Sequence, residues 1–417
     1  MQKYAAIVGL YIDRIESKLR GFVNYEKERN NMAEALTGVN GAIIQWAREH
    51  YNMSTEVAAQ AIGIDKQRYE RWERNEEFPT YAMLKKISEL FQKPSALFFF
   101  PAPPALPEIN GELRTLPNSV ISSFSKHIIK QFEKAQAYQI YLREIYGDRY
   151  CILSETENFP VSIVDLAKYI RNRLSFPIKA QKQRKSDKVV FEYFREKFYE
   201  QGIYVFKDSF GDNSVSGLCL YDIEFPIIII NNAMSFARQS FTLFHELYHL
   251  ISKTGGAEII RDDFYSYLDA DQTVTEKDCD SFANEFLIPT DDFKAEIRGK
   301  SITDILIADL AKTYSVSKEA VMYKLYSLRY ITADDYNVLK EYFYGDAIRA
   351  KGAGDGQKSS GGNHYYTKLA YLGYQYTGAV FNQYFAGKID SYRAGEMLSS
   401  KIENLPKLES AFFRGMK

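Results

Sequence analysis

The chain has 417 residues, more than a single hydrophobic core usually organises, so its length predicts two or three domains. Apolar residues make up 46% and charged residues 26%, a balance that excludes collagen-like, coiled-coil and wholly disordered proteins. Lysine and arginine number 53 against 54 acidic residues, and the net charge of −1 argues against a strongly basic nucleic-acid coat protein.

The three cysteines are odd in number and far apart in the sequence, which argues against a disulfide framework and favours a reducing compartment. No apolar run is long enough to form a signal-peptide core or a membrane span. We therefore expect a cytoplasmic protein that makes no contact with membranes.

Residues 41–100 predict a run of short helices. Ser54 caps a helix that ends in a tight turn at Gly63, and Asp65 caps the next helix, over 66–73. A helix, a glycine turn and a second helix at this spacing form the helix-turn-helix arrangement. The segment is therefore predicted to be an all-α domain.

The remainder of the chain predicts a multidomain protein, mainly α with a small β-sheet. We expect strands at 202–206, 217–221 and 226–231, and helices over 116–150, 161–201, 235–252, 276–287 and on to about 345. The predicted domains are an N-terminal helical lead (1–40), the helix-turn-helix (41–100), a proline-rich linker and helical connector (101–184), an α+β domain (185–345), a Gly/Ser-rich linker (346–364) and a helical C-terminal segment (365–417).

The most specific motif is His245-Glu246-Leu-Tyr-His249, an HExxH pattern inside a predicted helix. Two histidines four residues apart project from one helix face and can share a tetrahedral zinc ion, while Glu246 can reach a water beside the metal and remove its proton. The alternative is two core histidines and a glutamate with ordinary partners, but burying three such groups without a metal is costly.

The helix predicted over 276–287 supplies candidates for a third ligand. On a helical wheel Glu276 lies nearest its apolar stripe, and Asp280 on the same side could accept a hydrogen bond from a ligand histidine. Cys279 lies within the stripe and is interpreted as a small buried side chain. The alternative for Glu276 is a favourable interaction with the dipole at the helix N-terminus.

Two segments together resemble the ImmA/IrrE-type metallopeptidases. Residues 238–250, RQSFTLFHELYHL, follow PIIIINN, and residues 276–289, EKDCDSFANEFLIP, resemble the family's second motif, a glutamate followed by a helix ending in Leu-x-Pro. The family is similar to thermolysin-like zinc proteases, so the resemblance implies an α+β zincin fold of the gluzincin kind and endopeptidase activity. It implies Zn2+ as the cofactor, although other divalent ions suit the same ligands.

Carried over to this chain, the resemblance implies zinc ligands at His245, His249 and Glu276, a catalytic base at Glu246 and a ligand-orienting acid at Asp280. The chain departs from the family at Tyr248, where a glycine is common, and at Asp280, where Ala-Asn often follows. The strand at 226–230 is either the edge strand that holds an extended substrate peptide or a buried core strand.

Residues 41–100 resemble the Xre-type, lambda-repressor-like module that often precedes this protease domain, although Thr55 stands where such modules commonly present glutamine. The resemblance implies a groove-facing set of residues, namely Lys66, Gln67, Glu70 and Arg71. Residues 53–94 carry seven positive and seven negative side chains, so we expect weak DNA affinity unless the charges segregate or the domain dimerises. DNA binding and a docking or homodimerisation role both stay open.

The sequence thus predicts a zinc endopeptidase coupled to a helix-turn-helix module. Family association suggests a regulatory protein as substrate, for example a repressor, in stress response, mobile-element control or toxin-antitoxin control. The alternative is a DNA-binding regulator or antitoxin whose protease-like domain acts mainly as a sensor.

Overall fold

The computed structural model describes residues 34–104, 118–184, 186–254, 256–259, 268–353 and 363–415. Most of the predicted helical lead and part of each predicted linker lie outside these ranges. Within them, no helix combines the length and apolar character needed to cross a bilayer.

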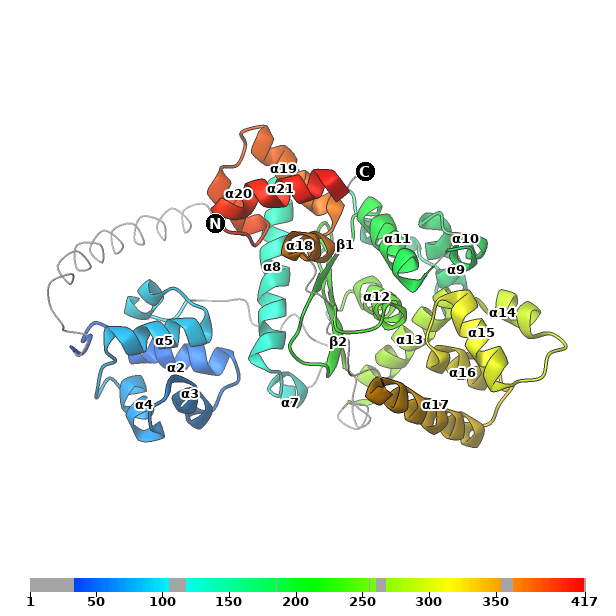
Figure 1. The fold of residues 1–417 in the computed structure, drawn as a ribbon, viewed down its shortest axis with the longest axis horizontal. Coiled ribbons are helices and arrows are strands. Elements are labelled where there is room, and N and C mark those ends of the chain that lie inside the picture. The colour runs from blue at the N-terminus through cyan, green and yellow to red at the C-terminus, as the bar shows by residue number, and fades with distance from the viewer. Residues whose placement is uncertain are drawn as a thin grey trace. The chain divides into compact units, whose positions relative to one another are not determined.

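The chain divides into two compact units. The first comprises Met1–Glu108 and Ser122–Ile129, and the second comprises Ile109–Ile121 and Lys130–Lys417. Figure 1 shows the short helices of the first unit in blue and the small green sheet of the second unit among its helices.

In the first unit, the helix boundaries follow the capping residues. The side chains of Ser54, Asp65 and Thr80 each accept the backbone N–H of the residue three positions on, as predicted for an N-cap. Gly63, with φ of 79°, ends the first helix of the helix-turn-helix pair in a left-handed turn. The helices are α2 (Gly41–His50), α3 (Thr55–Ile62), α4 (Lys66–Glu73), α5 (Tyr81–Phe91) and the 3-10 helix η2 (Ser95–Phe99).

The helices of the first unit close over an aromatic core. Tyr69 and Trp72 on α4 and Phe91 on α5 are fully buried. Helix α2 begins so close to the end of α4 that a Cβ on Gly41 would lie 2.2 Å from the carbonyl oxygen of Trp72. Only glycine permits that approach, so Gly41 sets how α2 and α4 pack.

The second unit is organised around one four-stranded sheet. Its strands are β1 (Tyr204–Asp208), β2 (Val215–Leu220), β3 (Ile227–Asn231) and β4 (Gly256–Ile259), in the order β1-β3-β2-β4. Strands β1 and β3 are parallel, whereas β2 pairs antiparallel with β3 and β4. Strand β4 was not predicted, because it has only four residues and begins with Gly256, a residue type that is unfavourable in strands.

The position of β3 decides between the two roles that the sequence leaves open for it. The strand at 226–230 lies between β1 and β2, so it is a core strand and cannot serve as the edge that holds a peptide. All five residues of β3 are buried, as expected of a strand covered on both faces.

Helices lie on both sides of the sheet (Figure 1). Successive side chains on each strand point to opposite faces. Phe206 on β1 stacks 3.9 Å from Tyr138 on α8 (Lys126–Tyr146), on one face. Val205 and Ile228 join the core built by α11 (Asp187–Glu200) and α12 (Phe236–Ile251), on the other. The sheet therefore holds α12, the helix of the HExxH motif, against a buried surface.

The second unit includes residues that the sequence assigns to the segments on either side of its α+β domain. Residues 151–176, assigned by sequence to the connector, pack in the same core as α12. Helix α17 continues through the first residues of the predicted 346–364 linker. The helices outside the sheet are α7 (Asn118–Ile121), η3 (Ile152–Asn158), α9 (Ile163–Arg173), α10 (Ile178–Lys182), α13 (Ala270–Leu287), α14 (Thr290–Ile297), α15 (Asp304–Tyr314), α16 (Lys318–Ser327) and α17 (Ala333–Ala353).

The C-terminal segment docks on the sheet through a buried arginine. Arg195 on α11 donates to the carbonyl oxygen of Val205 on β1, at 2.7 Å, and to those of Ala370 and Tyr371, both at 2.6 Å. The guanidinium of Arg195 thus satisfies two of the last carbonyl oxygens of α18, and its positive charge complements the dipole at the C-terminal end of that helix. The segment comprises α18 (His364–Leu372), α19 (Tyr374–Phe385), α20 (Ser391–Met397), η5 (Ile402–Asn404) and α21 (Leu405–Gly415).

Candidate metal centre and helix-turn-helix surface

Helix α12 presents the HExxH side chains inside the protein. Ser235 caps the helix by accepting the backbone N–H of Arg238. His245, Glu246 and His249 are 2%, 0% and 0% exposed, so this polar face is turned into the interior. Burial of three polar groups on one face requires partners that satisfy them.

Helix α13 supplies a further buried acid. It begins at Ala270 rather than at 276, behind a capping box in which Asp269 and Gln272 exchange hydrogen bonds. Glu276 therefore lies in the second turn, which removes the alternative that it serves only the dipole of a helix N-terminus. It is 1% exposed and faces α12.

The three predicted ligand side chains meet at one point. One carboxylate oxygen of Glu276 lies 3.2 Å from Nε2 of His245, and the other lies 3.5 Å from Nε2 of His249. Ligand atoms on a tetrahedral zinc ion stand about 3.3 Å apart, given metal–ligand bonds of roughly 2.0–2.2 Å. The spacing therefore suits a shared metal ion.

Two atoms at this point lack other partners. Among the described residues, Nε2 of His249 and Oε1 of Glu276 are buried and have no hydrogen bond, apart from their mutual approach. Buried polar atoms rarely remain unsatisfied. A divalent cation would satisfy both, so the donor set fits the metal that the motif implies.

The other ring nitrogen of each histidine has an acceptor. Nδ1 of His245 lies 3.0 Å from Asp280, and because an ionised carboxylate only accepts, Nδ1 must donate. Nδ1 of His249 lies 3.2 Å from the hydroxyl of Thr254, whose own proton goes to the backbone carbonyl of His249. In their neutral form, both imidazoles are thereby held with a lone pair on Nε2, the tautomer that binds a metal.

Sequence reasoning missed the role of Thr254 and the proximity of Cys279. Thr254 follows the end of α12 and returns to it only through a turn, for which the sequence carries no pattern. Cys279 is buried, as predicted, but its Sγ also forms a potential metal-binding group with His245 and His249, their ligand atoms all within 4.8 Å of one another. Its spacing of three residues from Glu276 on one helix was the available signal.

Protonation separates the two candidates for the third ligand. Burial raises the pKa of Glu276, but the neighbouring His249 and His245 outweigh burial and lower the pKa to about 2. Burial and the nearby carboxylates of Glu276 and Glu246 raise the pKa of Cys279 well above its ordinary value. At neutral pH the carboxylate is thus already ionised, whereas the thiol must first lose a proton.

Tyr248, which replaces the glycine common in the family, packs against α13. Its ring lies 5.5 Å from that of Phe282 in a tilted arrangement. Burial raises the pKa of its hydroxyl to about 12, so the side chain is neutral at pH 7. Tyr248 thus adds an aromatic contact between the two helices that carry the candidate ligands.

The residues predicted to face DNA lie together on α4, but the cations among them are paired. Lys66 forms ion pairs with Glu56 and, at 3.7 Å, with Glu70. Nε of Arg71 lies 3.0 Å from Glu77, while Gln67 is exposed. The groove-facing surface therefore carries little unpaired positive charge.

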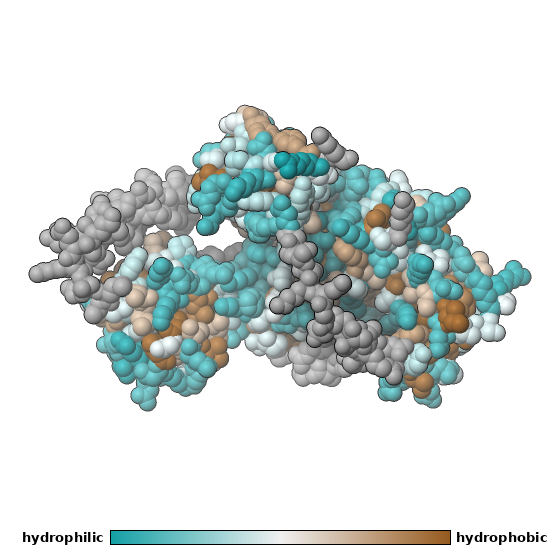
Figure 2. Space-filling model, viewed as in Figure 1, coloured by the Kyte–Doolittle hydropathy of each residue, from teal (hydrophilic) through white to brown (hydrophobic). Residues whose placement is uncertain are grey.

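Apolar groups are also exposed on this unit. Figure 2 shows brown, hydrophobic surface on the helix-turn-helix unit beside teal, polar residues. Val57 on α3 and Tyr81 on α5 are 51% and 44% exposed. Such side chains suit contact with another protein as well as with DNA.

Two family models match the chain in the regions that carry these features. Residues 44–98 match a helix-turn-helix model, and residues 199–326 match a model of the IrrE N-terminal-like domain of the M78 peptidases. The chain therefore combines an Xre-like helix-turn-helix domain with an ImmA/IrrE metallopeptidase-like domain. This confirms the predicted combination and the predicted fold class, mainly α with a small sheet.

A protein of known structure also aligns with part of the chain. A Mycobacterium tuberculosis transcriptional regulator of known structure aligns with 46% of this chain and 51% of its own length, at 16% identity and a TM-score of 0.27. The alignment thus spans about half of that structure. A search of curated proteins finds no match.

Proposed function

We propose that the chain is a cytoplasmic zinc-dependent endopeptidase whose helix-turn-helix domain brings it to a regulatory target. The observation that supports this most directly is the approach of Glu276 to Nε2 of both His245 and His249. The orientation of the two imidazoles by Asp280 and Thr254 supports it further, because those contacts leave the metal-binding nitrogens unprotonated.

His245, His249 and Glu276 would hold the ion, with Asp280 and Thr254 fixing the imidazoles. The ion, when bound, would supply Lewis acidity, which polarises a peptide carbonyl and lowers the pKa of a bound water molecule. Glu246, buried on the same helix, removes a proton from the attacking water and delivers it to the nitrogen of the leaving amine.

Strand β4, rather than β3, is suited to hold an extended substrate peptide. It stands at the end of the sheet, pairs only with β2 among the described residues, and lies close to the end of α12. An extended peptide can add to such an edge through main-chain hydrogen bonds. We propose β4 as the strand that aligns the substrate with the metal ligands.

The proposed class of substrate is inferred from the presence of these two domains in one chain. Helix-turn-helix and peptidase-like domains in one chain suggest a protease that acts on a regulator, such as a repressor, in stress response, mobile-element control or toxin-antitoxin control. The helix-turn-helix match equally supports DNA as a second partner, which would make the peptidase-like domain a sensor.

Peptide-bond cleavage by Glu246 can be tested without knowing the substrate. Wild type loaded with zinc is incubated with a library of cellular proteins, and new N-termini are identified by mass spectrometry. We expect cleavages by wild type and by Glu196→Gln, an exposed surface control, and none by Glu246→Gln at equal zinc content. Cleavage by Glu246→Gln at the wild-type rate would reject this mechanism.

A further inference from the structure

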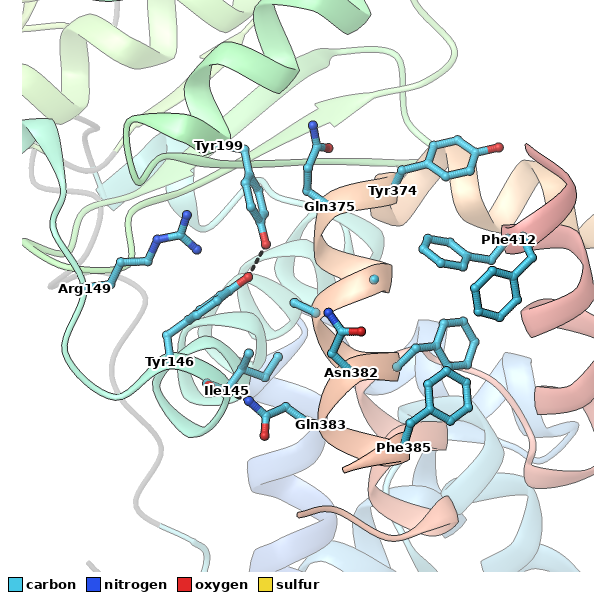
Figure 3. Close-up of a pocket in the computed structure, with 14 residues that line it drawn as sticks. Ile145, Tyr146, Arg149, Tyr199, Tyr374, Gln375, Asn382, Gln383, Phe385 and Phe412 are labelled. Carbon is cyan, nitrogen blue, oxygen red and sulfur yellow. Dashed lines mark hydrogen bonds between the residues drawn. The ribbon is translucent and has the colours of Figure 1, made fainter. Parts of the chain in front are cut away.

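The C-terminal segment contributes to a pocket that the peptidase mechanism does not use. The pocket has a volume of about 760 Å³, within the range of roughly 300–1,000 Å³ usual for small-molecule sites. The pocket lies along helix α19, with side chains of α8 and α11 on one side of that helix and side chains of α21 on the other (Figure 3). Gly378 lets the Phe412 ring pack close to α19, because a Cβ there would lie 3.2 Å from that ring, and Ala379 adds only a methyl group to the lining.

Half of the lining side chains are aromatic. Seven of the fourteen lining residues carry aromatic rings, namely Tyr146, Tyr199, Tyr374, Phe381, Phe385, Phe412 and Phe413. Phe385 and Phe413 are 52% and 49% exposed and stack on one another with ring centres 6.4 Å apart. Exposed stacked rings at the edge of a cavity favour a ligand that itself presents a flat apolar face.

Arg149 is the single charged residue that lines the pocket. It is half-buried, and its guanidinium carbon lies 4.4 Å from the centre of the Tyr146 ring and 5.1 Å from that of Tyr199. Among the described residues, no carboxylate lies within ion-pair distance of it, unlike Arg143 and Arg173 close by in the sequence. The hydrogen bond between the Tyr146 and Tyr199 hydroxyls holds the two rings together beside it (Figure 3).

We infer that this pocket binds a small aromatic organic anion, with its rings packed among the aromatic side chains and its anionic group on Arg149. A cationic ligand would be repelled by the one charge present. An anion without rings would leave the half-exposed phenylalanines uncovered. Guanidinium groups bind carboxylate, sulfonate and phosphate oxygens through paired N–H donors, which would orient such a ligand.

Two probes that differ only in charge test the inference. Anilinonaphthalene sulfonate supplies aromatic rings and an anionic group, and N-phenyl-1-naphthylamine supplies the same rings without charge. Titration calorimetry on the full chain measures stoichiometry and affinity for each. We expect about one bound sulfonate per chain in wild type, and about tenfold weaker binding in Arg149→Gln, with binding of the neutral probe unchanged.

A second variant tests the place of binding. Ala379→Phe fills the pocket from α19 without removing an existing side-chain contact, and we expect it to weaken both probes. Arg298→Gln, which removes an exposed arginine directly after α14, serves as the charge control, and this variant should bind both probes as wild type does. Circular dichroism establishes that each variant is folded.

Two results would overturn the inference. One is sulfonate affinity in folded Arg149→Gln or Ala379→Phe equal to that of wild type, which would place the probe elsewhere. The other is an equal loss of sulfonate affinity in Arg298→Gln, which would show that the effect of Arg149→Gln arises from net charge alone.

Discussion

Thr254 holds His249 through two hydrogen bonds of opposite sense. Its hydroxyl donates its proton to the backbone carbonyl oxygen of His249 at 3.0 Å. The hydroxyl oxygen can therefore only accept from Nδ1 of the same residue, at 3.2 Å. The backbone N–H of Thr254 reaches the same carbonyl at 2.9 Å. The turn that ends α12 thus selects the tautomer of a candidate metal ligand.

Removing that hydroxyl should weaken metal binding while leaving the fold intact. Thr254→Val preserves the shape of the side chain and the backbone bond to His249, but it takes away the acceptor for Nδ1. We expect zinc affinity, measured by competition with a chelator, to fall about 10- to 100-fold. Thr254→Ser, which keeps the hydroxyl, should retain the wild-type zinc affinity. Thr313→Val, which removes a hydroxyl on α15, should not change that affinity. Equal affinities in all four proteins would show that the tautomer is set by other contacts.

The third ligand can be identified by comparing two residues on α13. We expect wild type to carry about one zinc ion per chain, Cys279→Ala to retain it, and Glu276→Gln to lose most of it. The reason is that Glu276 lies within 3.5 Å of both imidazole nitrogens and is ionised at neutral pH. Elemental analysis gives the metal content, with Asp271→Asn on the same helix as control. Metal lost from Cys279→Ala and kept by Glu276→Gln would assign the site to two histidines and a cysteine.

Ion pairs on the helix-turn-helix unit should limit its affinity for DNA. Glu77 pairs with Arg68 at 2.6 Å and with Arg71 at 3.0 Å. The three side chains are partly exposed, and ion pairs at a protein surface are worth roughly 0–1 kcal/mol, so Glu77→Gln should free both arginines without unfolding the domain. We expect binding to a random-sequence duplex, measured by fluorescence anisotropy, to strengthen about three- to tenfold and to become more salt-dependent.

Glu89→Gln, which removes an exposed acid on α5, controls for net charge in that experiment. Alanine at Lys66, Gln67 and Arg71 together should abolish the gain. A duplex affinity that none of these variants alters would favour the docking role for this domain.

Arg195 should determine whether the C-terminal segment stays on the sheet. Arg195→Met keeps the apolar stem but leaves the carbonyl oxygens of Val205, Ala370 and Tyr371 without their charged donor. The loss should cost roughly 3 kcal/mol or more, since each buried acceptor left unsatisfied costs about 1–3 kcal/mol. Amide exchange of α18 should then accelerate about 100-fold, as read by hydrogen-exchange mass spectrometry. Exchange as slow as in Arg298→Met would show that other contacts hold α18.

Local chemistry determined where several helices begin and which residues share a face. Ser54, Asp65 and Ser235 bond only to the backbone three residues ahead, so their N-caps are legible in the sequence. The spacing of His245 and His249 places them on one face of any α-helix. Helix α13 was a partial exception, because the capping box at Asp269 lies before its apolar stripe starts.

Tertiary structure alone decided which segments came together. The four isoleucines of β3 suit a buried strand, but its central position depends on pairing with β1 and β2 across loops. The return of Thr254 onto His249, the approach of α13 to α12 and the pairing of Glu77 with Arg71 are likewise contacts between elements. Periodicity and caps report only interactions within a few residues, whereas these contacts are selected by burial and charge across the whole fold.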